Sequence, residues 1–252
     1  MIKVVILGSG NVASHLIKAM EANTAIDLVQ VYARSKKSLE NVMDSNKITT
    51  SFTTLKEADV YVISVSDKAI EEVSNQIPFT NKLVVHTSGT MDFNVINPKN
   101  KRGVFYPLQT FSKNKEINMQ EVPFCLETEN IEDYNSVGNL AKSLSNSVYN
   151  ITGEQRKSLH ISAVFVSNFV NHLYQIGDAL CIENNVPFAI LQPLIEETAN
   201  KIKTLAPVDA QTGPAIRNDE PTIEKHLEAL TNPTYKELYR QLTLSIQNVK
   251  KL

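Results

Sequence analysis

The chain has 252 residues, of which 42% are hydrophobic and 21% are charged. These fractions match those of soluble globular proteins and exclude disordered, collagen-like and coiled-coil chains. With 25 basic and 27 acidic residues the formal net charge is -2, so the charge balance favours no nucleic-acid partner.

The first half of the chain alternates apolar strands with helices. Strand-like runs cover residues 2–7, 28–33, 60–65, 83–86, 104–106, 122–126 and 148–151. Helical periodicity marks residues 11–22, 67–76 and 131–144, and capping-box spacing predicts a further short helix over residues 54–57. Strands that are continuously apolar indicate a parallel sheet covered by helices on both faces.

After residue 152 the pattern changes to helices alone. Helical segments are predicted near residues 154–176, 188–205, 222–230 and 233–249. The sequence therefore predicts an α/β fold, with a Rossmann-like doubly wound parallel sheet over residues 1–152 and an all-α domain over residues 153–252.

Neither the cysteines nor the chain start indicates secretion. Cys125 and Cys181 lie in unrelated contexts without metal-ligand spacing, so we expect neither a disulfide framework nor a metal site. Residues 2–7 lead straight into a glycine-rich segment, which does not fit a signal peptide. Residues 158–177 contain no Asp, Glu, Lys or Arg but carry polar groups that are costly in hydrocarbon. We expect a cytoplasmic protein with no membrane partner, in which that helix is buried by protein.

The segment after the first strand has the form G-x-G-x-x-A. Gly8 permits a tight turn, Gly10 lets a pyrophosphate approach the backbone, and Ala13 lets the helix pack against the strand. The phosphates would lie at the helix N-terminus, where free N–H groups favour anions. The predicted backbone contacts come from Gly8, Ser9, Gly10, Asn11 and Val12.

The residues after the second strand distinguish the cofactor. An NAD site usually has an acid here to hold the ribose 2′-hydroxyl, whereas this chain has Arg34, Ser35 and Lys36. Arg34 offers a planar fork to a 2′-phosphate, Ser35 offers a hydroxyl and Lys36 a positive charge, so NADP is favoured over NAD. The alternative is a solvated basic loop.

Polar residues also follow the later strands, at the edge where open parallel sheets bind ligands. For Asp67 we favour a helix-capping role, and the other residues serve either the loops or the cofactor pocket. The predicted contacts are Ser64, Val65, Ser66, His86, Ser88 and Gln109.

The uncharged segment and a later Gly-Pro turn supply the remaining candidates. His160 and Asn168 fall within about 80° on a regular helix, so His160, Ser167 and Asn168 are catalytic candidates. Buried polar groups that satisfy one another are the alternative. Asn171 and Arg217 are candidates for substrate binding, Arg217 because its guanidinium can hold a carboxylate or phosphate bidentately.

The chain resembles a bacterial family of NADP oxidoreductases that pairs a Rossmann-like domain with a helical domain of unknown function, DUF2520. The resemblance covers nearly the whole chain and is carried by residues 8–13, 86–89, 106–111, 166–169 and 213–219. The N-terminal half is also similar to pyrroline-5-carboxylate reductases, coenzyme F420-dependent NADP reductases and ketopantoate reductases.

The resemblance implies a homodimer formed through the helical domains and an active site between the domains. β-Hydroxyacid dehydrogenases of related fold use a lysine on the first long helix of the second domain, but no lysine occurs here between Lys157 and Lys201. A proton donor would then be His160, a neutral polar group or water.

These features predict an NADP(H)-dependent oxidoreductase that transfers hydride to or from a small polar substrate. The alternative is a non-catalytic NADP-binding sensor or regulatory protein, and a third interpretation is a reductase of coenzyme F420.

Overall fold

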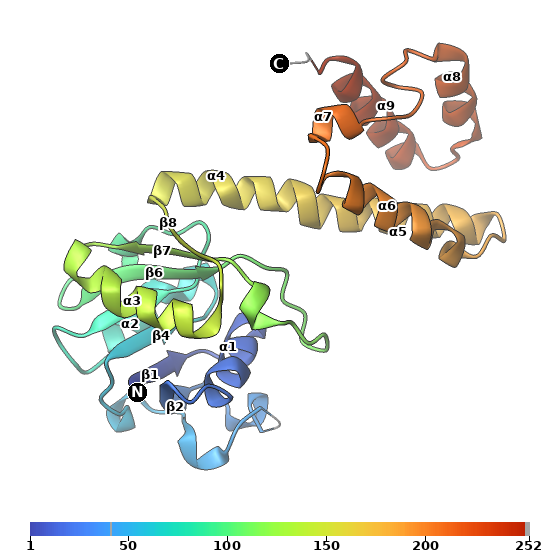
Figure 1. Cartoon of the computed structure of the whole chain (residues 1–252). Helices are drawn as coiled ribbons and strands as arrows, with labels where there is room; N and C mark the ends of the chain where they lie inside the picture. The colour runs from blue at the N-terminus through green and yellow to red at the C-terminus, as the bar shows by residue number, and fades with distance from the viewer. Residues whose placement is uncertain (41, 250–252) are drawn as a thin grey trace. The chain divides into compact units, whose positions relative to one another are not determined.

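The computed structural model describes residues 1–40 and 42–249 and consists of two compact units, Met1–Ser167 and Asn168–Leu252. The described part of the first unit contains an eight-stranded sheet, shown in blue to yellow-green in Figure 1. Its strands are β1 (Ile2–Leu7), β2 (Ile26–Tyr32), β3 (Ile48–Thr49), β4 (Val60–Ile63), β5 (Leu83–His86), β6 (Lys101–Pro107), β7 (Phe124–Thr128) and β8 (Val148–Asn150).

The strand order is β3-β2-β1-β4-β5-β6-β7-β8, which contains the Rossmann order 3-2-1-4-5-6 with two strands added at one edge. The pairs from β3 to β6 are parallel. The predicted fold class is therefore confirmed.

Two strands, β7 and β8, run against the other six, which the sequence pattern did not predict. β7 pairs antiparallel with β6, so that Pro107 lies opposite Phe124. The connection between them returns at the same end of the sheet, where the N–H of Leu108 donates to the carbonyl oxygen of Pro123 at 2.8 Å. Because no long helix carries the chain back to the opposite end, a parallel crossover cannot form.

Helices cover both faces of the sheet. On one face, Val4 and Ile6 of β1 share a core with α1 (Asn11–Glu21) and α3 (Ile131–Leu144). On the other, the alternate β1 residues pack with α2 (Ile70–Gln76). Successive side chains of a strand point to opposite faces, so a strand covered on both sides is apolar throughout.

The helix predicted over residues 54–57 does not form. The chain leaves a 3₁₀ turn, η3 (Phe52–Thr54), and continues without helical structure to β4. The N–H of Lys56 donates to Oε1 of Gln30 at 2.8 Å. A side chain from β2 thus takes an amide that a helix would use for its own hydrogen bonds.

The last helix of the first unit, α4 (Gly153–Ala163), begins with a complete capping box made by Thr152 and Gln155. Its first turn carries Arg156, which is fully buried. Arg156 forms an ion pair with Glu127 on β7, and its Nη2 donates to the carbonyl oxygen of Met91 at 2.6 Å. A buried cation therefore fastens the start of α4 to the sheet and to the loop after β5.

The second unit is helical, as predicted. A π-helical stretch, η7 (Val164–Phe169), connects α4 to α5 (Val170–Glu183) along the chain. The remaining elements are η8 (Phe188–Leu191), α6 (Gln192–Lys201), α7 (Pro207–Ala210), α8 (Glu220–Ala229) and α9 (Pro233–Gln247). The division predicted at residue 152 remains a prediction.

The uncharged segment over residues 158–177 differs from its predicted environment. None of these residues is buried in the structure, although the sequence predicts a helix enclosed by protein. Within residues 168–249 only Ala215, Ile223 and Thr243 are buried. The second unit thus has almost no core of its own. Across the described ranges, no helix combines the length and the apolar character needed to cross a membrane.

Candidate functional site

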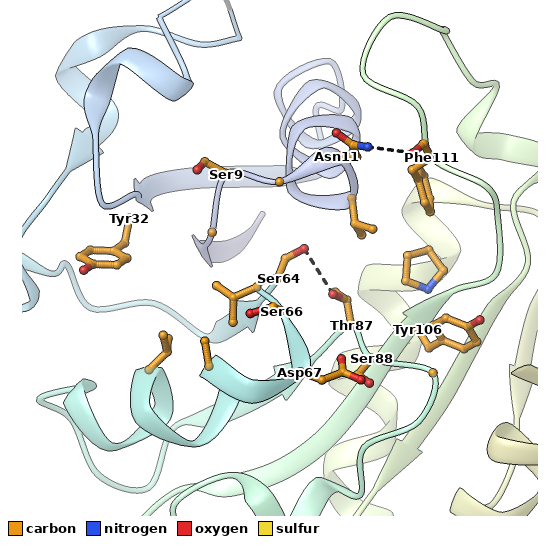
Figure 2. A pocket seen from close by; sticks show the side chains of 18 of the residues that line it. Ser9, Asn11, Tyr32, Ser64, Ser66, Asp67, Thr87, Ser88, Tyr106 and Phe111 are labelled. Atoms are coloured by element: carbon orange, nitrogen blue, oxygen red, sulfur yellow. Dashed lines mark hydrogen bonds between the residues drawn. The ribbon is translucent and has the colours of Figure 1, made fainter.

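A cavity of about 810 Å³ lies in the first unit, where the carboxyl ends of β1, β2, β4, β5 and β6 meet (Figure 2). This is the edge at which open α/β sheets bind ligands, and the volume is typical of small-molecule sites. The residues predicted from the sequence that line it are Gly8, Ser9, Gly10, Asn11, Val12, Arg34, Ser64, Val65, Ser66, Ser88, Gln109 and His160.

Glycine occupies the two positions of the first turn, 8 and 10, for different structural reasons. Gly8 has a φ of +143°, and a Cβ built on it would overlap the carbonyl oxygen of Ser64 at the end of β4. Gly10 has φ -75° and ψ -174°, which any residue adopts, and a Cβ there would meet nothing within 4 Å. Gly8 is required by packing, whereas Gly10 keeps the approach to the head of α1 open.

The N-terminus of α1 offers free backbone N–H donors to the cavity. The first backbone hydrogen bond at this end runs from the N–H of Ser14 to the carbonyl oxygen of Gly10 at 2.9 Å. The N–H groups of Asn11 and Val12 precede it and have no partner within the helix. Together with the helix dipole they fit an anion such as a pyrophosphate.

One wall of the cavity is aromatic and ends in a cation. The rings of Tyr32 and Phe52 lie 4.1 Å apart between centroids at 33°, and Arg34 lines the cavity just beyond β2. Ser35 and Lys36 follow Arg34 as exposed residues and are not among the lining residues. A flat apolar surface beside a guanidinium fits an adenosine that carries a phosphate.

Another part of the lining is held by hydrogen bonds between loops. The hydroxyl of Thr87 donates to Oγ of Ser64 at 3.2 Å (Figure 2). Asp67 lines the cavity, and its Oδ2 accepts a hydrogen bond from the hydroxyl of Thr90 at 2.6 Å. The expected capping role of Asp67 is therefore wrong: the residue lies in a 3₁₀ turn, η4 (Asp67–Ala69), and joins two loops instead.

His86 is predicted to line the pocket, but its side chain is fully buried and outside the lining. Its Nδ1 accepts from the N–H of Ser88 at 3.2 Å, and its Nε2–H donates to the carbonyl oxygen of Asp92 at 3.3 Å. Burial and the nearby positive charge of Arg156 lower the pKa of His86 from 6.5 to about 4. A neutral His86 thus shapes the loop that places Ser88 in the cavity.

His160 reaches the cavity from α4 and meets Tyr106 of β6, which is not among the site residues predicted from the sequence. The Tyr106 hydroxyl lies 3.0 Å from Nδ1 of His160, and both residues line the cavity. Burial raises the pKa of Tyr106 to about 12, so its hydroxyl stays protonated at neutral pH.

The other catalytic candidates and the two substrate-binding candidates are not part of this lining. Ser167 lies in η7 at the end of the first unit, and Asn168, Asn171 and Arg217 belong to the second unit. The angle expected between His160 and Asn168 assumed a regular α-helix, and the π-helical stretch changes that relation because it has more residues per turn. Their functional roles remain predictions.

A parallel sheet whose strand order reverses beside β1, with a glycine turn that leads into a helix at that point, defines a Rossmann-type domain. The sequence families that match the chain agree with this class of domain. Residues 3–89 match the family described as NADP oxidoreductase coenzyme F420-dependent, and residues 122–246 match the domain of unknown function DUF2520. No protein with a curated description matches the chain significantly.

Solved structures extend the similarity to the whole chain. A "putative NADP oxidoreductase" from Bacteroides fragilis is 39% identical, with 98% of each chain covered and a TM-score of 0.89. At this identity over nearly its full length, the chain belongs to that family, in which a Rossmann-like NADP oxidoreductase domain precedes DUF2520.

Two more distant structures show the same fold. A protein from Thermotoga maritima is 20% identical, with 97% of this chain and 96% of that chain covered and a TM-score of 0.74. Pyrroline carboxylate reductase from Plasmodium falciparum, with NADP bound, is 16% identical, with 98% of each chain covered and a TM-score of 0.64.

Alanine substitutions at the two glycines of the first turn should differ in their effect on stability. Gly8→Ala should lower the free energy of unfolding by about 3 kcal/mol, because the new Cβ overlaps backbone at a positive φ. Gly10→Ala should change it by less than about 1 kcal/mol, because both backbone and space accept a methyl group. Urea unfolding of both variants checks this contrast, and equal losses would contradict it.

The lowered pKa of His86 predicts that the free energy of unfolding depends on pH. Its pKa is 6.5 unfolded and about 4 folded, so the unfolded state binds the proton more readily. The contribution, about 3 kcal/mol, is complete above pH 6.5 and is lost as the pH falls toward 4. Urea unfolding across this window should show stability rising with pH. A His86→Gln variant should show a shallower rise, and an unchanged slope would argue against this assignment.

Proposed function

We propose that the cavity of the first unit binds NADP(H) and that the protein is an NADP(H)-dependent oxidoreductase acting on a small polar substrate. The observation that carries the proposal is the turn into α1, where Gly8 packs against β4 and Gly10 leaves the helix N-terminus open. The fit of this turn to a pyrophosphate agrees with the name of the Bacteroides fragilis relative.

The residues around the cavity would hold successive parts of the cofactor. Backbone groups of Gly8, Ser9, Gly10, Asn11 and Val12 would contact the pyrophosphate. The aromatic pair of Tyr32 and Phe52 would lie against the adenine, and Arg34 with Ser35 and Lys36 would bind the 2′-phosphate. The preference for NADP over NAD then follows from a cation where NAD sites have an acid.

When bound, NADP(H) supplies or accepts the hydride. The chain would orient the substrate and hold a proton beside the reacting atoms. His160 is the proposed proton-bearing group, because it is the catalytic candidate that lines the cavity. Ser167 and Asn168 remain further candidates, and Asn171 and Arg217 remain the proposed substrate contacts. The position of the substrate between the two domains remains a prediction.

The same proposal includes a cytoplasmic homodimer formed through the helical domain. Both Cys125 and Cys181 are free thiols, which suits a reducing compartment. The second unit buries few side chains, and several large apolar ones are 57% to 69% exposed: Ile182, Ile190, Leu194 and Ile202. Exposed apolar surface of this kind favours association with a second copy.

Replacing Arg34 tests the assignment of the cofactor. Arg34→Ala should weaken NADPH binding about 10- to 100-fold but NADH binding by less than about threefold, because only NADPH carries the phosphate. Lys37→Ala, which removes an equal charge from the same loop, serves as the matched control and should have a small effect. Calorimetric titration of both cofactors measures this. An equal loss for NADPH and NADH would reject the assignment, and no binding to the unaltered protein would reject the proposed function.

The dimer proposal predicts a mass in solution of twice 28.1 kDa by light scattering. Replacing Ile190 and Leu194 together by Asp should shift the protein to monomer, because two charges would enter an apolar interface. Glu196→Ala, on α6 together with Leu194, should remain dimeric. A monomeric unaltered protein would overturn the proposal, and circular dichroism separates dissociation from unfolding.

A further inference from the structure

The contact between Tyr106 and His160 specifies which nitrogen of the imidazole is available for chemistry. We propose that Tyr106 is a positioning residue that donates its hydroxyl hydrogen to Nδ1 of His160, so that the neutral imidazole presents its Nε2–H to the heteroatom of the substrate. The inference rests on the proposed function and adds the tautomer of His160 and the residues that set it.

The direction of the hydrogen bond follows from the needs of the phenol. Tyr106 is only 9% exposed, and its hydroxyl lies 3.0 Å from Nδ1 of His160. Among the described residues, Nδ1 is the acceptor that lies within hydrogen-bond distance of this hydroxyl. If Nδ1 carried the hydrogen instead, the phenolic hydrogen would lack a protein acceptor in a largely buried position. With Nδ1 as acceptor, a neutral imidazole must carry its hydrogen on Nε2.

Gly89 supports the same contact by sterics. A Cβ built on Gly89 would lie 2.6 Å from Nδ1 of His160 and 2.8 Å from Cζ of Tyr106. The φ of Gly89 is outside the left-handed region, so the backbone alone does not require glycine there. The absence of a side chain at this position therefore gives the two rings the space to meet.

Arg156 holds the elements that carry the pair. It lies one helical turn before His160 on α4 and pairs with Glu127 on β7. β7 is hydrogen-bonded to β6, where Tyr106 lies opposite Cys125. The same guanidinium binds the carbonyl oxygen of Met91, two residues after Gly89. The buried guanidinium of Arg156 thus connects α4, the antiparallel pair of β6 and β7, and the loop after β5, which meet at the Tyr106–His160 contact.

A neutral imidazole held in this way can act as an electrophile. When hydride adds to the carbon of a C=O or C=N bond, the electron pair of that bond moves to the heteroatom, and the Nε2–H donor stabilises the developing charge. The heteroatom then takes a proton from water, which completes the reduction and leaves the imidazole neutral. A tautomer fixed in advance presents the donor at no further cost in reorganisation. In this scheme Tyr106 acts through His160 and does not itself need to lose its proton.

The test is nitrogen NMR of the full-length protein labelled at the histidine ring nitrogens. His160→Gln assigns the His160 signals among those of the five histidines. At a pH where the imidazole is neutral, Nδ1 should be unprotonated with the shift of a hydrogen-bonded acceptor, and Nε2 should carry the hydrogen. A protonated Nδ1 in the unaltered protein would overturn the proposal directly.

Variants then test the cause. In Tyr106→Phe, Nδ1 should move to the shift of an imidazole without this donor, and Gly89→Ala should have the same effect because it separates the rings. Tyr149→Phe, on β8 and 54% exposed, is the matched control and should leave the signals unchanged. An unaltered Nδ1 shift in Tyr106→Phe would reject the assignment, even if Gly89→Ala fails to fold.

Cofactor binding and turnover separate this inference from the proposed function. NADPH affinity, measured by calorimetry, should change by less than about threefold in Tyr106→Phe, whereas kcat with an imine or 2-keto acid should fall about tenfold or more. An unchanged kcat would reject the role of the pair in catalysis. Failure of the unaltered protein to bind NADPH would reject the proposed function, while the NMR measurement would still decide the tautomer.

Discussion

The close approach of the first turn to β4 is the constraint on which the site depends. At Gly8 the backbone passes so near the carbonyl of Ser64 that no side chain fits, and this contact sets where α1 begins. The helix N-terminus consequently opens at the carboxyl end of the sheet, between the two halves of the strand order. Loops from five strands then meet around one cavity, and each contributes polar groups to it.

A second constraint acts at the other end of the cavity, where a charge is buried. Arg156 is fully enclosed, and its pairing with Glu127 compensates a desolvation cost of several kcal/mol. Such a pair contributes little to net stability, because the attraction between the charges is offset by the cost of removing them from water. It still fixes the geometry, because removal of either partner would leave an uncompensated charge. Arg156 lies one helical turn before His160 and binds the loop that contains Gly89. It therefore links the fold of the sheet to the chemistry proposed for the cavity.

The two units differ in how their stability arises. The sheet buries continuous apolar strands between helices on both faces, as expected of a self-sufficient core. The helical unit buries three residues within its described range and exposes many large apolar side chains. Helices of this kind gain most of their stability from tertiary packing, so the exposed surface accounts for the proposed association of two chains.

Local signals in the sequence determined the α/β class, the change to helices near residue 152 and the glycine turn at residues 8–13. Periodicity and the glycine motif can both be recognised from residues that are close together in the sequence. Tertiary structure decided the rest. It made β7 antiparallel, took Lys56 out of a helix by giving its N–H to Gln30, and buried His86 beneath the pocket. It also brought Tyr106 to His160, 54 residues away, because contacts between distant segments depend on how elements pack and leave no periodic trace in the sequence.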